Sequence, residues 1–95
     1  MTKNEIIAFL KEQKEFLKSE FFVDKIGLFG SFARDEANEQ SDIDIVIVSS
    51  KKDFYNRYRL KEFLKQHLKK DIDIGYLDSL RSYIKKQIEK EIIYV

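Results

Sequence analysis

The chain has 95 residues, enough for one hydrophobic core and too few for a second folded unit. It has no cysteine, which excludes disulfides and thiolate metal sites, and its charged residues, 37% of the chain, nearly cancel to a net charge of +1, which gives little reason to expect direct nucleic-acid binding. No apolar run is long enough to span a bilayer and the first residues do not resemble a signal peptide, so we expect one domain, residues 1–95, in the cytoplasm without membrane contact.

The N-terminal segment predicts an amphipathic helix that ends near Ser19. Thr2 and Glu5 have the spacing of a capping box, in which each side chain satisfies a free backbone group of the first turn. The apolar side of this helix comprises Ile6, Ile7, Phe9, Leu10, Phe16 and Leu17. The β-branched and aromatic residues at about 25–29 then predict a first strand, in which Gly27 marks a close backbone approach or a bulge.

The middle of the chain predicts a helix, a loop and a second strand. A short helix is expected over about residues 31–37, and the polar segment 35–41 is expected to form a surface loop. Residues 42–48 are rich in isoleucine and valine and predict the second strand. Because this strand is apolar on both faces, we expect both faces to be covered.

The second half of the chain predicts a helix, a strand and a last helix. The first helix opens at Ser49 or Ser50 and ends near Lys70, and its buried stripe comprises Leu60, Phe63, Leu64, His67 and Leu68. Residues 71–76 predict the third strand, and Asp78 or Ser79 is expected to cap the last helix. The inward face of that helix comprises Leu80, Tyr83, Ile84, Ile88 and Ile92. The element order αβαβαβα predicts an α/β fold with a small mixed three-stranded sheet flanked by helices.

The most informative stretch joins the first two strands. Gly30 and Ser31 end an apolar run, where glycine permits close backbone approach and serine caps free N–H groups at a helix start, a position that attracts phosphate. Asp42 and Asp44 follow in the second strand, whose period of two sends both carboxylates to one face. Adjacent like charges are costly unless a cation neutralises them, and Mg²⁺ takes oxygen ligands that it commonly shares with substrate phosphates. The stretch therefore predicts a phosphate site beside a metal site.

The strand directions add a third carboxylate to this site. If the Gly30–Ser31 bend and Asp42 serve one site, the first two strands must be antiparallel, whereas the long helix between the second and third strands makes those two parallel. The third strand then starts at the same edge as the second, which brings Asp71 or Asp73 beside the first two carboxylates. Three carboxylates and a phosphate-binding turn are the parts required for two-metal phosphoryl transfer.

These residues resemble the minimal nucleotidyltransferases of the DNA polymerase β-like superfamily. The hallmark of that family is Gly-Ser followed at a set distance by Asp-x-Asp, and the pairs Gly30-Ser31 and Asp42-x-Asp44 match it. The Ser-Phe-Ala-Arg continuation after Gly30 and the serine before Asp42 are also typical. The resemblance covers nearly the whole chain, including its length and the order of its elements.

The resemblance also distinguishes between the two candidates for the third carboxylate. The family's third aspartate lies in a strand phrase such as Val-Asp-Leu, and the phrase around Asp73 matches it, so the resemblance favours Asp73 over Asp71. Asp71 is then expected to pair with a lysine at the sheet edge. One departure from the family pattern is Asp35, where many relatives have glycine.

The resemblance implies a role for each site residue. The expected nucleotide-binding residues are Gly30, Ser31 and Arg34, and the expected catalytic and metal-binding residues are Asp42, Asp44 and Asp73. The first group would bind the β- and γ-phosphates of ATP, and the first two aspartates would hold two Mg²⁺ ions. Asp73 would bind one metal and help to activate an acceptor hydroxyl for attack on the α-phosphate, with pyrophosphate leaving. For Arg34, a salt bridge on the helix surface is an equal alternative.

Stand-alone members of this family are commonly encoded beside a HEPN-domain RNase toxin, and as its antitoxin they transfer AMP from ATP to a tyrosine of that toxin. The resemblance therefore implies a magnesium-dependent protein adenylyltransferase with a HEPN toxin as its partner. Two alternatives stay open: a fold that neutralises the toxin by binding alone, and an enzyme that modifies a small-molecule hydroxyl. The intact set of three aspartates counts against the first, and the lack of an extra acceptor domain counts against the second.

Two further features of the long helix have simple structural explanations. His67 lies among apolar residues and is interpreted as a histidine at the core edge without a catalytic role. Basic residues recur every four positions along the same helix, at Arg57, Lys61, Lys65 and Lys69. Such a ridge is usually a solvated face, and a docking surface for an acidic or RNA-bound partner is the alternative.

Overall fold

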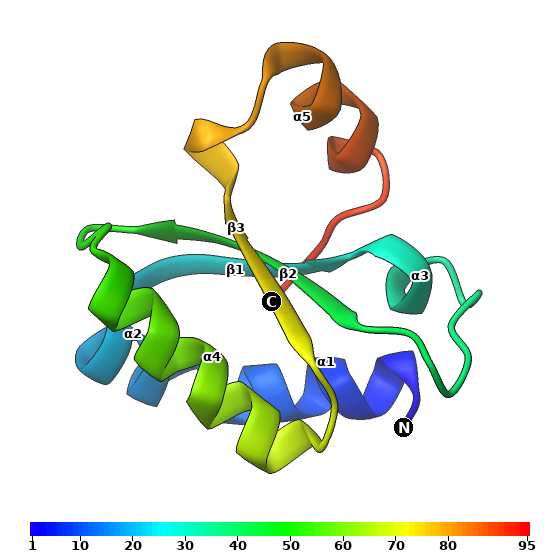
Figure 1. Ribbon diagram of the computed structural model, residues 1–95, viewed down its shortest axis with the longest axis horizontal. Helices are drawn as coiled ribbons and strands as arrows, with labels where there is room; N and C mark the ends of the chain where they lie inside the picture. The colour runs from blue at the N-terminus through cyan, green and yellow to red at the C-terminus, as the bar shows by residue number, and fades with distance from the viewer.

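A four-stranded mixed sheet forms the centre of the computed structural model, which describes residues 1–95 (Figure 1). Across the sheet the strands lie in the order β3 (Ile72–Tyr76), β2 (Ile43–Ser49), β1 (Val23–Phe29) and β4 (Ile93–Tyr94). β1 is antiparallel to β2 and β4, whereas β2 and β3 are parallel. These directions confirm the predicted α/β fold and the predicted arrangement of the first three strands.

The short strand β4 is the one strand that the sequence does not predict. Two residues are too few to show the alternation that marks a strand. β4 pairs with β1 at Gly27 and Leu28, and a Cβ atom on Gly27 would lie only 2.6 Å from Cγ2 of Ile92. The close approach predicted at Gly27 is therefore confirmed, and the register irregularity of β1 lies elsewhere, between Val23 and Lys25.

Two helices, α1 (Lys3–Glu12) and α2 (Lys14–Phe21), replace the single N-terminal helix that the sequence predicts. The predicted capping box of Thr2 and Glu5 is present at the start of α1. Gln13 separates the two helices, with φ −92° and ψ 2°. The buried residues keep helical spacing across this break: Ile6, Leu10, Leu17 and Phe21. Because that spacing fits a straight helix equally well, the apolar pattern could not reveal the break.

The long helix α4 (Phe54–Leu68) starts later than the sequence predicts. Ser49, one of the two predicted caps, instead ends β2, and its hydroxyl donates to the carbonyl oxygen of Phe22 (2.8 Å). The cap is Asp53, whose carboxylate accepts the N–H of Asn56 (2.6 Å). Serine and aspartate are both favoured at this position, so residue type alone did not separate the two possibilities.

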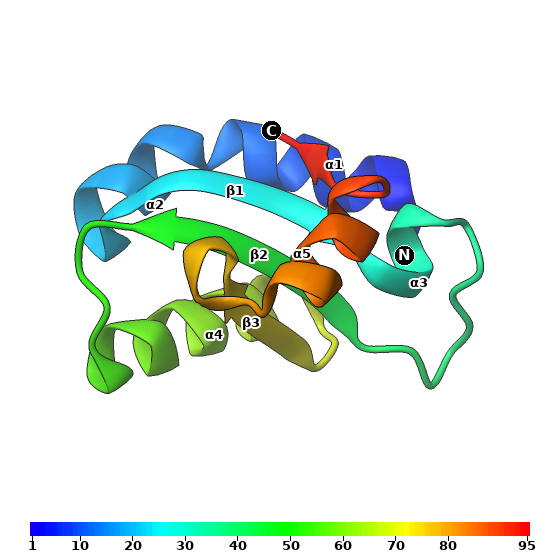
Figure 2. The ribbon, with the colours of Figure 1, turned by 90° about the horizontal axis from the view of Figure 1, so that it is seen from above.

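The core lies between one face of the sheet and the helices α1, α2 and α4 (Figures 1 and 2). Its fully buried members include Ile26, Leu28, Ile43, Ile45, Ile47, Leu60, Leu64, Leu68 and Ile72. His67, predicted within the buried stripe of α4, is exposed and packs against the ring of Phe63 (4.4 Å between ring centroids). No helix of the chain combines the length and the apolar character needed to cross a membrane.

The last helix, α5 (Ser82–Glu89), lies over the opposite face of the sheet (Figure 1). The predicted cap lies within a segment that instead forms a 3₁₀ turn, η1 (Leu77–Ser79), and Asp78 forms an ion pair with Lys52 (2.6 Å). No residue of α5 is buried, and Tyr83 of the predicted inward face is 66% exposed. The other four residues of the predicted inward face, Leu80, Ile84, Ile88 and Ile92, are half-buried, so that face is confirmed except at Tyr83.

Candidate active site

Three of the predicted site residues lie in one row across the sheet. In the strand register, Phe29 of β1 is opposite Asp44 of β2, and Asp44 is opposite Asp73 of β3. Gly30 directly follows Phe29, and adjacent strands lie about 4.8 Å apart. The isoleucines on either side of Asp44 are fully buried in the core, so the strand's period of two turns Asp44 to the other face. The structure therefore brings the glycine bend and these two aspartates together.

The environment of Asp44 disfavours its negative charge. Burial raises the pKa of Asp44, and the negative charges of Asp73 and Asp42 raise it further. The positive charge of Arg34 acts in the opposite direction without cancelling the effect on this pKa. Asp42 and Asp73 thus both lie close enough to Asp44 for their negative charges to act on its carboxylate. Such perturbed groups concentrate at functional sites, although structural charge networks also produce them.

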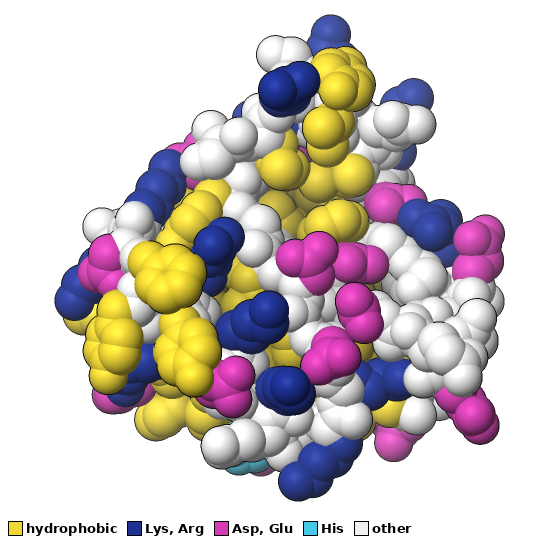
Figure 3. Space-filling view, in the orientation of Figure 1, with side chains coloured by type: hydrophobic (Ala, Val, Ile, Leu, Met, Phe, Trp, Pro, Cys, Tyr) yellow, Lys and Arg dark blue, Asp and Glu magenta, His cyan; other side chains and the backbone are white.

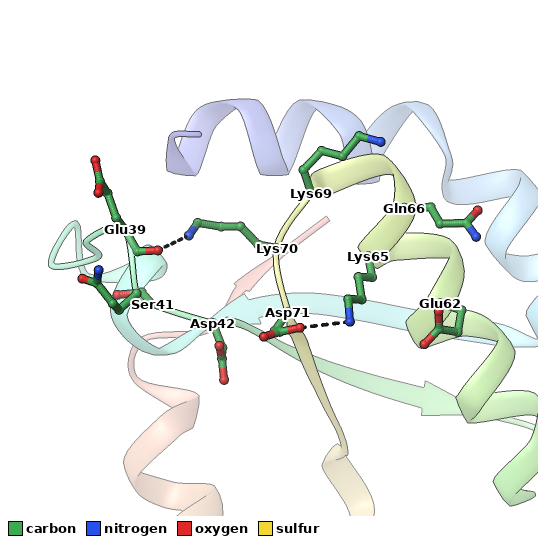
Figure 4. A pocket seen from close by; sticks show the side chains of 10 residues that line it. Glu39, Ser41, Asp42, Glu62, Lys65, Gln66, Lys69, Lys70 and Asp71 are labelled. Carbon is green, nitrogen blue, oxygen red and sulfur yellow. Dashed lines mark hydrogen bonds and ion pairs between the residues drawn. The ribbon is translucent and has the colours of Figure 1, made fainter.

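Asp42 and Asp71 both precede their strands but differ in their contacts. The Asp71 carboxylate pairs with Lys65 (3.2 Å) and is 70% exposed, which confirms the expected pairing with a lysine at the sheet edge. Figure 4 shows this carboxylate turned toward α4, whereas the Asp42 side chain points away from the ion pair. Both residues line a cavity of about 660 Å³ that has no hydrophobic lining residue. Asp73, and not Asp71, is the residue of the third strand that lies opposite Asp44.

The carboxylates suit a hard divalent cation that a substrate helps to bind. As placed, no three acidic, histidine or cysteine side chains form a complete metal cage. Mg²⁺ does not need such a cage, because it usually binds one or two carboxylates and completes its shell with substrate phosphates and water. Oxygen donors that repel one another beside a turn expected to bind phosphate fit this mode of binding.

Gly30 has a conformation and surroundings that require glycine. Its φ of +76° is left-handed, and a Cβ atom there would overlap the carboxylate of Asp44. Gly30 begins the short helix α3 (Gly30–Ala33), in which Ser31 is half-buried. α3 ends well before the predicted residue 37, because Asp35 adopts a φ of +60°. Glycine adopts a left-handed backbone without strain, so glycine would suit position 35, where this chain has aspartate.

Glu91 is a site residue that the sequence analysis missed. Its carboxylate accepts the Gly30 N–H (3.1 Å) and pairs with the Arg34 guanidinium (3.0 Å). Arg34 also pairs with Glu36 (3.1 Å), so the salt bridge weighed for this residue is present. An internal anion therefore binds two of the groups expected to bind phosphate. Glu91 gives no sequence signal, because its position depends on the pairing of β4 with β1.

The chain is similar to known proteins in both sequence and structure. The family model for the nucleotidyltransferase domain matches residues 10–95. The protein adenylyltransferase MntA of Thermococcus cleftensis is 35% identical over 96 residues, with 100% of this chain and 97% of that protein covered. A structure provisionally named a minimal nucleotidyltransferase superposes with a TM-score of 0.82 at 26% identity, and 98% of this chain and 95% of that chain are covered.

Two solved toxin–antitoxin complexes are also similar to the chain. A toxin–antitoxin structure with AMP-PNP gives a TM-score of 0.71 at 25% identity, with 99% of this chain and 72% of that chain covered. A complex of a tri-AMPylated HEPN toxin with an MNT antitoxin, from Shewanella oneidensis, gives a TM-score of 0.60 at 25% identity. There the alignment covers 97% of this chain and 66% of that chain.

Proposed function

The chain belongs to the nucleotidyltransferase domain family, and on that basis we propose that it transfers AMP from ATP to a tyrosine of a HEPN-domain toxin. By that transfer it would act as the toxin's antitoxin. The names of similar proteins support this proposal, since one is a protein adenylyltransferase and another is an MNT antitoxin in complex with an AMPylated HEPN toxin. The observation that carries the proposal is the row of Gly30, Asp44 and Asp73, which places a glycine turn suited to phosphate beside two carboxylates that repel each other.

In this proposal the triphosphate binds at the start of α3. The Gly30 N–H, the Ser31 hydroxyl and the Arg34 guanidinium would donate to the β- and γ-phosphates. Glu91 now accepts from the first and third of these groups. The triphosphate would therefore replace the Glu91 carboxylate, and the exchange of one anion for another keeps both donors satisfied.

The three aspartates would hold and activate the reacting groups. Asp42 and Asp44 would hold Mg²⁺ ions together with the triphosphate, and Asp73 would bind one of these ions. Bound Mg²⁺ neutralises charge on the transferring phosphate and on the leaving pyrophosphate. Asp73 is exposed on the edge strand. It would accept the proton of the acceptor hydroxyl while the hydroxyl oxygen forms a bond to the α-phosphorus. The bond from the α-phosphorus to the bridging oxygen breaks at the same time, and pyrophosphate leaves.

A labelling experiment tests the proposal. The protein is incubated with Mg²⁺, a HEPN-domain toxin and ATP labelled at either the α- or the γ-phosphate. AMP transfer predicts toxin labelled from α-labelled ATP only, and no labelling of a toxin whose acceptor tyrosine is replaced by phenylalanine. The double variant Asp42→Ala/Asp44→Ala should transfer no label, because both carboxylates of β2 are lost.

Asp71→Asn is the matched control for that double variant. It removes another aspartate carboxylate at the same sheet edge, but one that is paired with Lys65, so it should transfer AMP at the wild-type rate. Neutralisation of the toxin without any label, by wild type and double variant alike, would instead favour the binding-only alternative. Labelling of a small-molecule hydroxyl but not of the toxin would favour the alternative of an enzyme that modifies small molecules.

A further inference from the structure

The row of site residues has two distinct sides. Gly30 lies at the end of β1 on one side of Asp44, and Asp73 lies on β3 on the other side. In an in-line displacement the attacking and leaving oxygens are on opposite sides of the phosphorus. If the pyrophosphate end lies at Gly30, the acceptor hydroxyl must approach over β3. β3 is an edge strand, so its outer side is free of other strands.

A small hollow lies at this edge, between β3 and the first half of α4. It measures about 190 Å³ and is lined by Phe54, Arg57, Tyr58, Lys61, Asp73 and Ile74. Pockets for drug-sized ligands are about 300–1,000 Å³, so this hollow is sized for a side chain of a larger partner. One of its walls is Asp73, the carboxylate assigned to the acceptor hydroxyl in the proposed function.

The rim of the hollow is aromatic and exposed. Phe54 is 76% exposed and Tyr58 is 52% exposed, although Leu60 and Leu64 of the same helix are fully buried. Figure 3 shows a group of hydrophobic side chains at the start of α4, with acidic side chains near the middle of the same face. Aromatic side chains that are exposed as a group are typical of protein interaction surfaces.

The two cations of the hollow have no carboxylate partner within the chain. Other basic residues of α4 and of the segment before it are paired: Lys51 with Asp53, Lys52 with Asp78, Arg59 with Glu20 and Lys65 with Asp71. Arg57 and Lys61 form no such pair, and the Arg57 guanidinium lies over the ring of Tyr76 in β3 (5.8 Å to the centroid). Two unpaired positive charges beside an aromatic rim are complementary to acidic groups.

We propose that this hollow is the docking site for the acceptor, and that its occupant is an acidic polypeptide segment whose hydroxyl-bearing aromatic side chain reaches Asp73. The proposal rests on the proposed function, since it names the face by which the acceptor enters the same site. Acidic groups of the segment pair with Arg57 and Lys61, and its aromatic side chain packs against Phe54 and Tyr58. A nucleic acid would instead bring its phosphates toward the carboxylates of Asp42, Asp44 and Asp73, which repel them.

A pair of synthetic peptides provides the test. Each contains one tyrosine, flanked by glutamate in one peptide and by lysine in the other. Binding is measured by fluorescence anisotropy, and AMP transfer is measured with α-labelled ATP and Mg²⁺. We expect the wild type to bind the acidic peptide at least tenfold more tightly, and the variant Arg57→Glu/Lys61→Glu to lose or reverse that preference. Phe54→Ala/Tyr58→Ala should weaken binding of both peptides without changing the affinity for AMP-PNP.

Lys69→Glu is the matched control, because it reverses a charge at the far end of the same basic ridge and should leave the preference unchanged. Equal binding of the two peptides by the wild type would overturn the proposal, and so would an equal loss of preference in Lys69→Glu. Tighter binding of a single-stranded oligoribonucleotide that is abolished by Arg57→Glu/Lys61→Glu would also overturn it in favour of RNA. If the acidic peptide binds as expected but neither it nor a HEPN toxin is labelled, the proposed function fails and the docking site stands.

Discussion

The two faces of the central sheet differ in what they hold, although the same strands supply both. On the face covered by α1, α2 and α4, the side chains of Ile43, Ile45 and Ile47 are at most 1% exposed. On the other face Asp44 and Asp73 lie side by side, and α5 above them contributes no buried residue. Ile43, Ile45 and Ile47 of β2 therefore belong to the hydrophobic core, and Asp44 on the other face belongs to a cluster of charge, with the buried Val46 (1% exposed) next to it on that face.

This difference shows how a chain of 95 residues accommodates a costly site. Burying a carboxylate beside two others opposes folding. The buried isoleucines and leucines on the helix-covered face supply the opposing free energy, because each fully buried side chain contributes about 1.5–3 kcal/mol. The helix-covered face holds most of the core, and the other face, although it buries Val46, also holds groups selected for chemistry.

The largest expected effect comes from the charged face. Asp44→Asn should lower the rate of AMP transfer by at least about a thousandfold, since it removes a charge placed to stabilise the reacting groups. Its far-ultraviolet circular dichroism should match that of the wild type, because Asp44 lies outside the core. Initial rates with α-labelled ATP provide the measurement. A variant that folds normally and keeps a tenth or more of the wild-type rate would contradict the assignment.

The next largest effect comes from the helix-covered face. Ile45→Ala should lower the free energy of unfolding by about 2–5 kcal/mol, the usual cost of truncating a fully buried aliphatic side chain. Val48→Ala, a half-buried position on the opposite face of β2, is the matched control and should cost less. Urea denaturation followed by circular dichroism measures both. If both variants lost the same free energy of unfolding, the helix-covered face would not be the main source of stability.

The residues that the sequence predicts correctly are those with local signals. The capping box of Thr2 and Glu5, the bend at Gly30 and the alternation of β2 each follow from a few neighbouring residues. The parallel direction of the second and third strands followed from the long helix between them, which placed Asp71 or Asp73 beside Asp44, and the family resemblance favoured Asp73. The backbone and the row of carboxylates were thus predictable, whereas the roles of these residues stay proposals.

The features that the sequence does not predict depend on contacts between distant segments. The break at Gln13 leaves the apolar pattern unchanged, and the two-residue strand β4 has no pattern of its own. Glu91 reaches Gly30 because β4 pairs with β1, so a charged residue near the C-terminus resembles any solvated position. The cap of α4 and the exposure of Tyr83 on α5 were not predicted for the same reason, since both depend on which segment packs nearby.

A smaller effect is expected at Glu91, whose carboxylate contacts the Gly30 N–H and the Arg34 guanidinium. Glu91→Gln should tighten binding of AMP-PNP by about threefold to fivefold, because a neutral amide competes less strongly than a carboxylate with phosphate for the Arg34 guanidinium and the Gly30 N–H. Isothermal titration calorimetry in the presence of Mg²⁺ measures the affinity. Weaker binding in the variant would mean that Glu91 serves to orient Arg34 and does not compete with the nucleotide.

The smallest effect concerns stability and pH in the absence of metal. Because burial and neighbouring charges raise the pKa of Asp44, its protonated form is favoured in the folded state. The contribution of this protonation to folding stability is fully present below the ordinary aspartate pKa, and it is lost as the pH rises through the higher pKa of the folded state. Asp44→Asn should therefore melt slightly above the wild type at pH 7, by on the order of 2 °C.

The pH dependence of that difference is the sharper test. The gap in melting temperature between Asp44→Asn and the wild type should shrink as the pH falls toward the ordinary aspartate range, where both side chains are neutral. Thermal melts in a series of buffers from pH 7 to pH 4 measure it. A gap that stays constant across the series would show that Asp44 does not carry the unfavourable charge.

The most direct test of the central claim is a crystal structure of the protein with AMP-PNP and Mg²⁺. We predict that the triphosphate lies over Gly30 and Ser31, that the carboxylates of Asp42 and Asp44 bind Mg²⁺, and that Glu91 no longer contacts Gly30. A nucleotide bound instead in the polar cavity beside Lys65 and Lys70, with the Glu91 contact intact, would contradict the account.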